Sequence, residues 1–267
     1  MAARRILPRI NPQTFPARST FLRKSLYKVL GLVFLREWYV KRAIRHLGLE
    51  KNKALDILDA GSGFGQYSYY CAKRYPEANV LGLEINADHV ADGNRFVKKS
   101  GMERLRFQEA DITTIRFKDR FDLILAIDVL EHIEHDGDLL KRFFRALKPR
   151  GSLIVSTPTV YRKHLKDGKF VDEHFREGYS DEEVRQKFGE TGFFLDKILY
   201  GYGFWGDLSW RLSIRNTMKL MEYGFWGKLL AFFYLPFVFP VTLIFMVLDF
   251  WWPNKRGTGF IIVSEKS

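Results

Sequence analysis

The 267-residue sequence predicts an α/β fold in which helices cover both faces of a parallel sheet. Three observations lead to this prediction. Short apolar segments of strand length alternate with segments of helical periodicity from about residue 55 to the end of the chain. The first apolar segment runs into a turn with three glycines, and the second ends in a carboxylate. Such alternation is typical of strand–helix–strand units, whose strands pair in parallel.

The beginning of the chain holds most of its charge. Residues 1–53 carry 13 Lys and Arg against 2 Asp and Glu, and the net charge of the whole chain is +12. The remainder is therefore nearly neutral. Residues 1–20 contain Pro8, Pro12 and Pro16 and are expected to be extended or disordered. A basic arm of this kind suits an anionic membrane surface or a nucleic acid equally well.

One amphipathic helix is predicted from Phe21 to about Leu47. Apolar and basic side chains alternate along it at helical spacing: Leu22, Leu26, Val29, Leu30 and Val33 against Arg23, Lys24, Lys28, Arg36, Lys41, Arg42 and Arg45. We expect residues 21–37 to contact a membrane interface and the part after Trp38 to pack on the domain. No signal peptide is expected, because the apolar run Val29–Leu35 is short and lacks a cleavage pattern after it.

The segment at residues 55–65 is the centre of the predicted fold. Leu55, Ile57 and Leu58 predict a short buried strand, which ends at Asp59. Three glycines follow before a helix begins near residue 66: Gly61, Gly63 and Gly65. Glycine allows positive φ and lets a ligand approach the peptide groups, while N–H groups at a helix start favour a polar or anionic group. The turn therefore predicts a binding loop.

The other predicted elements follow in chain order. Strands are expected at 55–59, 79–84, 104–108, 121–127, 151–156, 193–200 and 258–264, and helices at 66–75, 87–100, 137–147 and 180–190. The single cysteine, Cys71, falls on a predicted helix and is expected to be a packed thiol. No disulfide can form within the chain, which suits a reducing compartment.

Carboxylates follow the next two strands. Glu84 ends the second strand about 20 residues after the glycines, where a carboxylate can accept hydrogen bonds from both hydroxyls of a ribose. Asp111 and Ile112 follow the third strand. A nicotinamide dinucleotide fits poorly, because its fingerprint places a small residue where this chain has Gln66.

Together these motifs resemble the class I methyltransferases that use S-adenosylmethionine (SAM). Glycine at every second position after an acidic residue is similar to their motif I, and the Glu-Ala-Asp-Ile run at 109–112 is similar to their adenine loop. The resemblance implies SAM as cofactor. It also implies roles for individual residues: Asp59, Gly61, Gly63, Gly65 and Asp128 at the methionine end, Glu84 at the ribose, and Asp111 and Ile112 at the adenine.

The resemblance also implies a Rossmann-like sheet of seven strands, the last antiparallel between the fifth and sixth. It covers about residues 50–200 and 258–265. The runs at 129–132 and 147–155 are similar to ubiquinone- and menaquinone-type small-molecule methyltransferases. We therefore expect three parts: a basic arm and helix at 1–47, a SAM-binding domain at 48–202 plus 257–267, and a hydrophobic membrane-associating insert at 203–256.

Two histidines are candidate general bases, His132 and His174. His132 could equally be a structural or capping residue, and His174 a surface residue in the variable segment 157–179 that covers the substrate in the family. Asp128, Glu131 and His132 partly match a metal set of quinone O-methyltransferases, and such residues can bind a divalent ion. We expect no metal, because relatives without metal carry the same residues.

The insert at 203–256 departs from the family pattern. Leu229–Leu248 is a run of 20 residues without a charge, long enough to cross a bilayer as a helix. A single crossing would separate the last strand from its sheet. Pro236 and Pro240 favour a kink or hairpin, and the tryptophans at 251–252 before Lys255 and Arg256 suit a membrane interface. We expect residues 225–252 to form a re-entrant or in-plane hairpin; the alternative is a buried helical pair or dimer interface.

These expectations predict a SAM-dependent methyltransferase at the cytoplasmic face of a membrane, peripheral or monotopic. Its acceptor would be a lipid, a quinone or a similar apolar small molecule that reaches the site from the bilayer. RNA or protein methylation is the first alternative. Only the basic arm supports it, and an Asn/Asp-Pro-Pro-aromatic motif is absent after the fourth strand, so nucleic acid is not the expected partner. An inactive membrane scaffold with a SAM fold is the second alternative.

Overall fold

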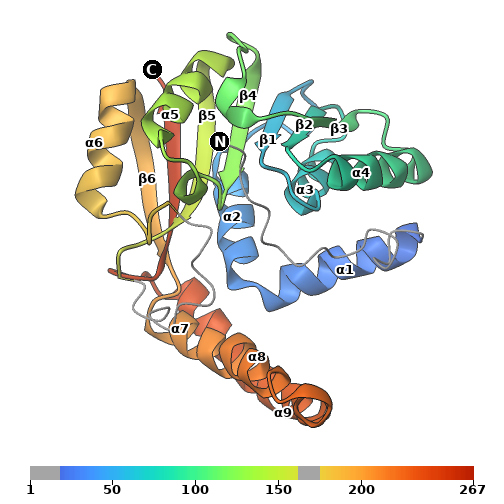
Figure 1. The fold of residues 1–267 in the computed structure, drawn as a ribbon. Helices are drawn as coiled ribbons and strands as arrows, with labels where there is room; N and C mark the ends of the chain where they lie inside the picture. Colours follow the sequence, from blue (N-terminus) through green and yellow to red (C-terminus); the bar gives the residue numbers. More distant parts are fainter. Residues whose placement is uncertain (1–18, 162–174) are drawn as a thin grey trace.

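The computed structural model describes residues 19–161 and 175–267, and its centre is one seven-stranded sheet (Figure 1). The strand order is β3-β2-β1-β4-β5-β7-β6. The bounds are β1 Asp56–Ala60, β2 Asn79–Glu84, β3 Leu105–Glu109, β4 Phe121–Ile127, β5 Leu147–Pro158, β6 Phe193–Gly201 and β7 Gly259–Lys266. All seven predicted strands are confirmed. The first five pair in parallel, and β7 is antiparallel between β5 and β6, as the family resemblance implied.

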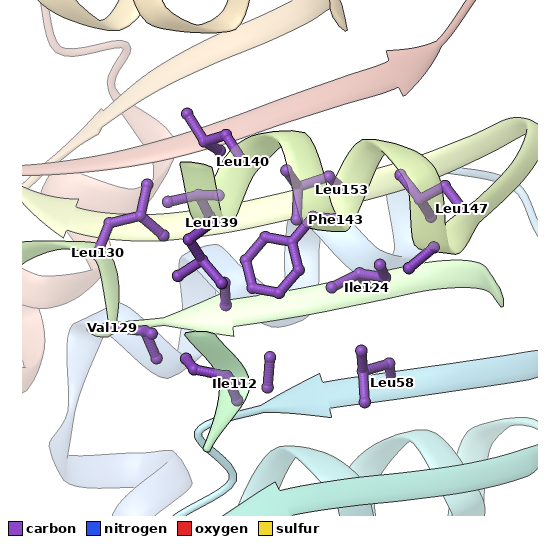
Figure 2. Packing of buried hydrophobic residues seen from close by; sticks show 14 of the residues in the cluster. Leu58, Ile112, Ile124, Val129, Leu130, Leu139, Leu140, Phe143, Leu147 and Leu153 are labelled. Carbon is purple, nitrogen blue, oxygen red and sulfur yellow. The ribbon is translucent and has the colours of Figure 1, made fainter. Parts of the chain in front are cut away.

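Helices cover both faces of the sheet, as predicted. The bounds are α3 Gln66–Arg74, α4 Ala87–Ser100, α5 Asp136–Ala146 and α6 Asp181–Thr191. On one face, Leu139, Leu140 and Phe143 of α5 pack over Ile124 and Leu153 of the central strands (Figure 2). The other face is covered by the helix at Leu35–His46 and by α3, where Cys71 is buried as expected. Burial of these apolar side chains on both faces stabilises the parallel strands.

The carboxyl ends of the parallel strands lie along one edge of the sheet, at the bottom of Figure 1. The loops that leave this edge carry the polar residues that the sequence singles out. The glycine turn follows β1, Glu84 ends β2, Asp111 follows β3 and Asp128 follows β4. Ligands of open α/β sheets bind at such an edge, so the topology brings these residues to one region.

The N-terminal region forms two helices rather than the single predicted one. α1 spans Thr20–Val33 and α2 spans Leu35–His46. Phe34 between them has an extended backbone (φ −99°, ψ 108°), which ends one helix and begins the next. α2 packs on the sheet from its first residue, since Leu35 is 1% exposed. The part that packs on the domain therefore begins earlier than predicted.

Arg23 lies where the sequence predicts an exposed basic face, yet it is 4% exposed. Its Nη1 forms an ion pair with Asp92 of α4 at 2.5 Å, and its Nη2 donates to the carbonyl of Phe64 at 2.8 Å. Tyr27 donates to the same carbonyl at 2.5 Å. A buried guanidinium requires partners of this kind, and they join α1 to α4 and to the glycine turn. Arg23 is therefore directed into the domain, although the sequence counts it among the basic residues of the predicted amphipathic helix.

Helices fill the insert between β6 and β7. One arm consists of α7 (Phe204–Trp210), a five-residue π-helical segment η4 (Arg211–Arg215) and α8 (Asn216–Met221), and the other is α9 (Gly224–Trp251). α9 continues through Pro236 and Pro240. The prediction that the prolines favour a hairpin there is therefore wrong. The chain reverses instead at Gly224, whose φ of 68° favours glycine. Packing of α9 along α7 and α8 offsets the helix hydrogen bonds that proline cannot donate.

The base of the insert is joined to the sheet domain by the fully buried Asp249. Its carboxylate accepts hydrogen bonds from the backbone N–H of Gly206 at 2.9 Å and from the hydroxyl of Tyr39 at 2.9 Å. Arg42 of α2 also donates to the carbonyl of Phe250 at 2.6 Å. Burial raises the pKa of Asp249. The two arms of the insert and α2 are thus connected through one carboxylate.

Replacing Asp249 with Ala should lower the free energy of unfolding by about 1–3 kcal/mol, because the buried Gly206 N–H loses its acceptor, while the Tyr39 hydroxyl keeps only the backbone carbonyl of residue 249. Urea unfolding followed by circular dichroism measures this change. Asp196→Ala removes an exposed carboxylate and should change the value by less than about 0.5 kcal/mol. Equal values for the two variants would contradict the role of Asp249.

Candidate functional site

The glycine turn after β1 has three residues in the left-handed region. The φ angles of Gly61, Gly63 and Gly65 are 76°, 52° and 76°. The N–H groups of Gly61 and Ser62 both donate to the carbonyl of Leu83, at 2.9 and 2.8 Å, which fixes the turn against the end of β2. The alternation of glycines in the sequence therefore corresponds to alternating backbone positions that other residues adopt only with strain.

The three glycines differ in what surrounds them. A Cβ at Gly61 would lie 2.7 Å from Cγ2 of Val129, and one at Gly65 would lie 2.4 Å from the ring of Phe107. A Cβ at Gly63 would meet nothing within 4 Å. Gly61 and Gly65 are therefore required by packing within the protein, while Gly63 presents an open face on which a ligand can contact the peptide backbone.

Asp59 lies behind the turn. Its carboxylate is 1% exposed and accepts a hydrogen bond from Oγ of Ser68 at 2.5 Å. Burial raises the pKa of Asp59 to about 6, against the lowering effect of the Ser68 hydroxyl. In this arrangement Asp59 joins the end of β1 to α3 through Ser68.

Glu84 connects the turn to the beginning of α4. Its Oε2 accepts from the N–H of Gly63 at 2.8 Å, and its Oε1 accepts from the N–H of Asn86 at 2.9 Å. The carboxylate is half-buried, and each oxygen has a further lone pair. Glu84 is thus held beside the open face of Gly63, where it can also accept from two neighbouring hydroxyls.

Asp111 and Ile112 begin the loop after β3. The Asp111 carboxylate accepts from the N–H of Thr113 at 2.8 Å and caps the 3₁₀ turn η2 (Ile112–Thr114), while the residue remains exposed. Ile112 is 9% exposed and borders the core under α5 together with Val129 (Figure 2). Asp111 can therefore accept from a ligand amino group, whereas only a small part of Ile112 is open to a ring.

Asp128 follows β4 with a φ of 54°, a conformation rare for residues other than glycine. It accepts from Oγ of Ser156 at 3.0 Å and forms an ion pair with Arg36 of α2. The sequence indicates no role for Arg36 at the site, since it reads as one more basic residue of an amphipathic helix. Only the return of α2 to the sheet edge brings its guanidinium to Asp128.

A cavity of about 170 Å³ opens beside this ion pair, between the sheet edge and the insert. Its walls come from α2, from the ends of β5 and β6, from the beginning of β7 and from α7: Phe34, Arg36, Tyr39, Asp128, Ser156, Thr157, Pro158, Gly201, Tyr202, Asp207, Trp210, Thr258, Gly259, Phe260 and Ile261. Aromatic and aliphatic walls with a few polar groups are typical of small-molecule sites. The cavity is therefore a candidate acceptor site.

Of the two candidate general bases, the structure describes His132 only. His132 is half-buried on the 3₁₀ turn η3 (Leu130–His132) and is not one of the residues that line the cavity. His174 lies outside the described residues. Glu131 is buried and accepts from Oγ1 of Thr157 at 3.1 Å, while Asp128 faces Arg36. Within residues 19–161 and 175–267, no group of three His, Cys, Asp or Glu side chains is arranged to hold a metal ion.

Comparison with known proteins places this geometry in context. A family model described as a methyltransferase domain matches residues 51–196. Phosphoethanolamine N-methyltransferase of Triticum aestivum is 29% identical over 150 residues, which cover 51% of this chain and 29% of that protein. Ubiquinone biosynthesis O-methyltransferase of Bradyrhizobium diazoefficiens is 31% identical over 103 residues, which cover 39% of this chain and 40% of that protein.

A solved structure has a similar fold. Phosphoethanolamine N-methyltransferase 2 of Haemonchus contortus, in complex with S-adenosyl-L-methionine, gives a TM-score of 0.62 at 18% identity and covers 94% of this chain and 58% of that chain. At this identity the likeness concerns the fold alone. The chain spans less than half the length of either curated relative, so the shared part is the domain that carries the glycine turn.

Replacing the buried Asp59 with Asn tests whether its pKa is raised in the folded protein. The native state binds the proton more tightly than the unfolded chain, whose aspartates titrate near pH ~4, so wild-type stability should fall as the pH rises from about 4 to about 6. The free energy of unfolding of Asp59→Asn, relative to wild type, should therefore increase across this window by up to about 2–3 kcal/mol. Urea unfolding at pH 4 and pH 7 measures the difference.

Ser68→Ala provides the matched variant, because it removes the hydrogen bond that lowers the pKa of Asp59. The stability of Ser68→Ala should therefore continue to fall, as the pH rises, to a higher pH than the stability of the wild type does. Parallel pH profiles for wild type and Asp59→Asn would contradict the raised pKa.

Proposed function

The chain belongs to the class I SAM-dependent methyltransferases, and from this premise we propose that it transfers a methyl group from SAM to an apolar acceptor at a membrane surface. The acceptor would be a lipid, a quinone or a similar small molecule. The observation that carries the proposal is the position of the cavity. It lies between the polar residues at the sheet edge and the first helix of an apolar insert.

The residues at the sheet edge fit SAM as cofactor. Gly63 offers an open backbone face, Glu84 can accept from the ribose hydroxyls, and Asp111 can accept from the adenine amino group. Asp128 and Arg36 carry opposite charges, which complement the ammonium and carboxylate of the methionine end. Bound SAM supplies an electrophilic methyl group, and the protein contributes by holding the acceptor atom in line with it and excluding water.

The insert supports an acceptor that arrives from a membrane. Within the described residues, α9 is the one helix long and apolar enough to cross a bilayer, with a mean hydropathy of 2.3 and 17% of its apolar window buried. A core helix of a soluble protein would be mostly buried, so this low value disfavours the alternative of an enlarged core. Large side chains are exposed along the helix: Phe225, Trp226, Leu230, Phe232, Phe233, Phe237, Ile244 and Trp251.

The insert favours in-plane contact over a re-entrant hairpin. α9 lies along the arm that contains Arg211, Arg215 and Lys219, so a hairpin inserted end-on would bring these cations into hydrocarbon. Lying flat, the same hairpin places α9 in the acyl region and the cations near lipid phosphates. Both ends of the insert also return to adjacent strands of one sheet. We therefore propose a monotopic or peripheral protein, on the cytoplasmic face because its one cysteine cannot form a disulfide within the chain, which suits a reducing compartment.

A small phosphorylated amine is the second candidate acceptor. The relative from Triticum aestivum is named for phosphoethanolamine, and the match to it covers 51% of this chain. The relative from Bradyrhizobium diazoefficiens is named for ubiquinone biosynthesis, and the aromatic walls of the cavity favour that acceptor class. Turnover with each class distinguishes them.

Calorimetric titration with SAM tests the cofactor. Wild type in detergent should bind, and Gly61→Arg should bind at least about tenfold more weakly, because the new side chain would meet Val129 at the turn. Gly101→Arg is the matched control. Gly101 has a similar φ of 65° but open space around it, so this variant should lose some stability and keep its affinity.

Turnover is then measured with methyl-labelled SAM and either a membrane lipid extract or phosphoethanolamine. Label in an extracted lipid or quinone supports the first acceptor class, and label in the phosphorylated amine supports the second. SAM binding without a labelled product from lipid, amine, RNA or protein substrates would favour an inactive scaffold. Absence of SAM binding by folded wild type would overturn the cofactor assignment.

Flotation with lipid vesicles tests the insert. Phe237→Asp should weaken vesicle binding at least about tenfold, because Phe237 is 80% exposed on α9 and would lose its burial in the bilayer. Phe194→Asp is the matched control, since Phe194 is 64% exposed on β6 outside the insert. Equal binding by the two variants would contradict membrane contact through α9.

A further inference from the structure

A second cavity, of about 460 Å³, lies between α1, α2 and α3 and shares no lining residue with the cavity at the sheet edge. Lysines from all three helices surround it: Lys24 and Lys28 of α1, Lys41 of α2 and Lys73 of α3. Tyr27, Trp38, Tyr69 and Tyr70 contribute aromatic walls. We call this feature the lysine groove. Its charge and its aromatic walls have no part in the proposed methyl transfer.

The positive charge of the lysine groove is largely uncompensated. Glu37 is the one acidic residue that lines it, and this carboxylate is 2% exposed and forms an ion pair with Lys41. In the part of the chain that the structure describes, no carboxylate forms an ion pair with Lys24, Lys28 or Lys73. Three lysines therefore line one cavity without a carboxylate partner among the described residues, and such a set of cations attracts a phosphate.

The groove is held in a fixed shape. The buried contacts of Arg23 with Asp92 and of Tyr27 with the Phe64 carbonyl fix α1 against the domain. Nε1 of Trp38 donates to the carbonyl of Gly31 at 2.8 Å, which joins α2 to α1. The groove is therefore preorganised, so that a ligand would bind with little loss of backbone freedom.

Gly31 also permits a close approach of Lys41 to α1. A Cβ at this position would lie 2.8 Å from Nζ of Lys41. Glycine in a helix interior costs about 1 kcal/mol relative to alanine, and here it leaves room for the lysine at the groove. The amino group of Lys41, on α2, thus reaches the same region as Lys24 and Lys28 of α1.

The surroundings indicate what kind of anion fits. Val29 and Leu32 are 53% and 44% exposed next to the lysines of α1, and Phe21 and Leu22 are exposed on the preceding turn. Figure 1 shows α1 and the apolar α9 on the same side of the molecule, beyond the carboxyl edge of the sheet. A phosphate joined to hydrocarbon matches lysines that are bordered by exposed apolar side chains. A nucleic acid backbone would leave these apolar side chains exposed to water.

We propose that the lysine groove binds the phosphate headgroup of an anionic phospholipid. This inference rests on the proposed function for its location at a membrane. The lysines contact the headgroup phosphate, the tyrosines and Trp38 contact the glycerol region, and the acyl chains extend along Leu32 toward the bilayer. Such a site would orient the domain on the membrane through a contact separate from α9.

Calorimetric titration with short-chain lipids below their micellar concentration tests the site. Wild type should bind dihexanoyl phosphatidylglycerol at least about tenfold more tightly than dihexanoyl phosphatidylcholine. The double variant Lys24→Ala/Lys28→Ala should lose this preference. The matched control Lys51→Ala/Lys53→Ala removes the same charge before β1, at the opposite edge of the sheet, and should keep it. Circular dichroism establishes that each variant is folded, and Lys73→Ala on α3 should weaken the preference independently.

The outcomes separate this proposal from the proposed function. The lysine groove is overturned as the site if the Lys24→Ala/Lys28→Ala variant keeps the preference for phosphatidylglycerol, or if the Lys51→Ala/Lys53→Ala control loses it equally. Either result leaves the proposed membrane contact of α9 unaffected. If glycerol phosphate binds as tightly as the lipid, the site is one for a free phosphate, and the proposal of a lipid ligand is overturned. A single-stranded RNA oligomer that binds more tightly than the lipid, through the same lysines, also overturns it. Absence of any vesicle binding by wild type overturns the membrane location itself.

Discussion

Insertion of β7 between β5 and β6 is the constraint on which the arrangement of the site depends. Gly259 at the start of β7 pairs with Pro158 at the end of β5 and with Gly201 at the end of β6. The insert must therefore leave and return at the carboxyl edge of the sheet, where the glycine turn also lies. The first helix of the insert becomes a wall of the cavity for this reason, and the exposed apolar surface of the insert is brought next to the methyltransferase site.

The N-terminal helices are connected to the same edge by buried polar contacts. Arg23 and Tyr27 both donate to the carbonyl of Phe64, which lies between two glycines of the turn. Arg36 on the next helix pairs with Asp128. A buried guanidinium without its partner is costly, so these contacts define where the helices lie. Helices α1 and α2 are thereby joined to the glycine turn and to Asp128, and Lys24, Lys28 and Lys41 of these helices line the lysine groove.

One charged group of the insert, Asp249, likewise fixes the position of a helix through buried hydrogen bonds. Asp249 is buried near the end of α9, after a run of 20 uncharged residues, and it accepts hydrogen bonds from Tyr39 of α2 and from the backbone at Gly206. An apolar residue at this position would leave the Gly206 N–H unpaired and the Tyr39 hydroxyl bonded only to the backbone carbonyl of residue 249. Any motion of the insert relative to the domain must therefore break this contact, which couples the orientation of α9 to that of α2.

The sequence alone determined the seven strands, four of the helices on the sheet and the turn at Gly61, because period-two and helical patterns and glycine spacing are local properties of the chain. It also determined the family. Only the tertiary structure decided that Arg23 is buried, that Asp59 bonds to Ser68 and that Arg36 reaches Asp128, since the partner of a polar side chain depends on which distant segments pack together. The continuity of α9 through its prolines was decided in the same way, by packing against a second helical arm.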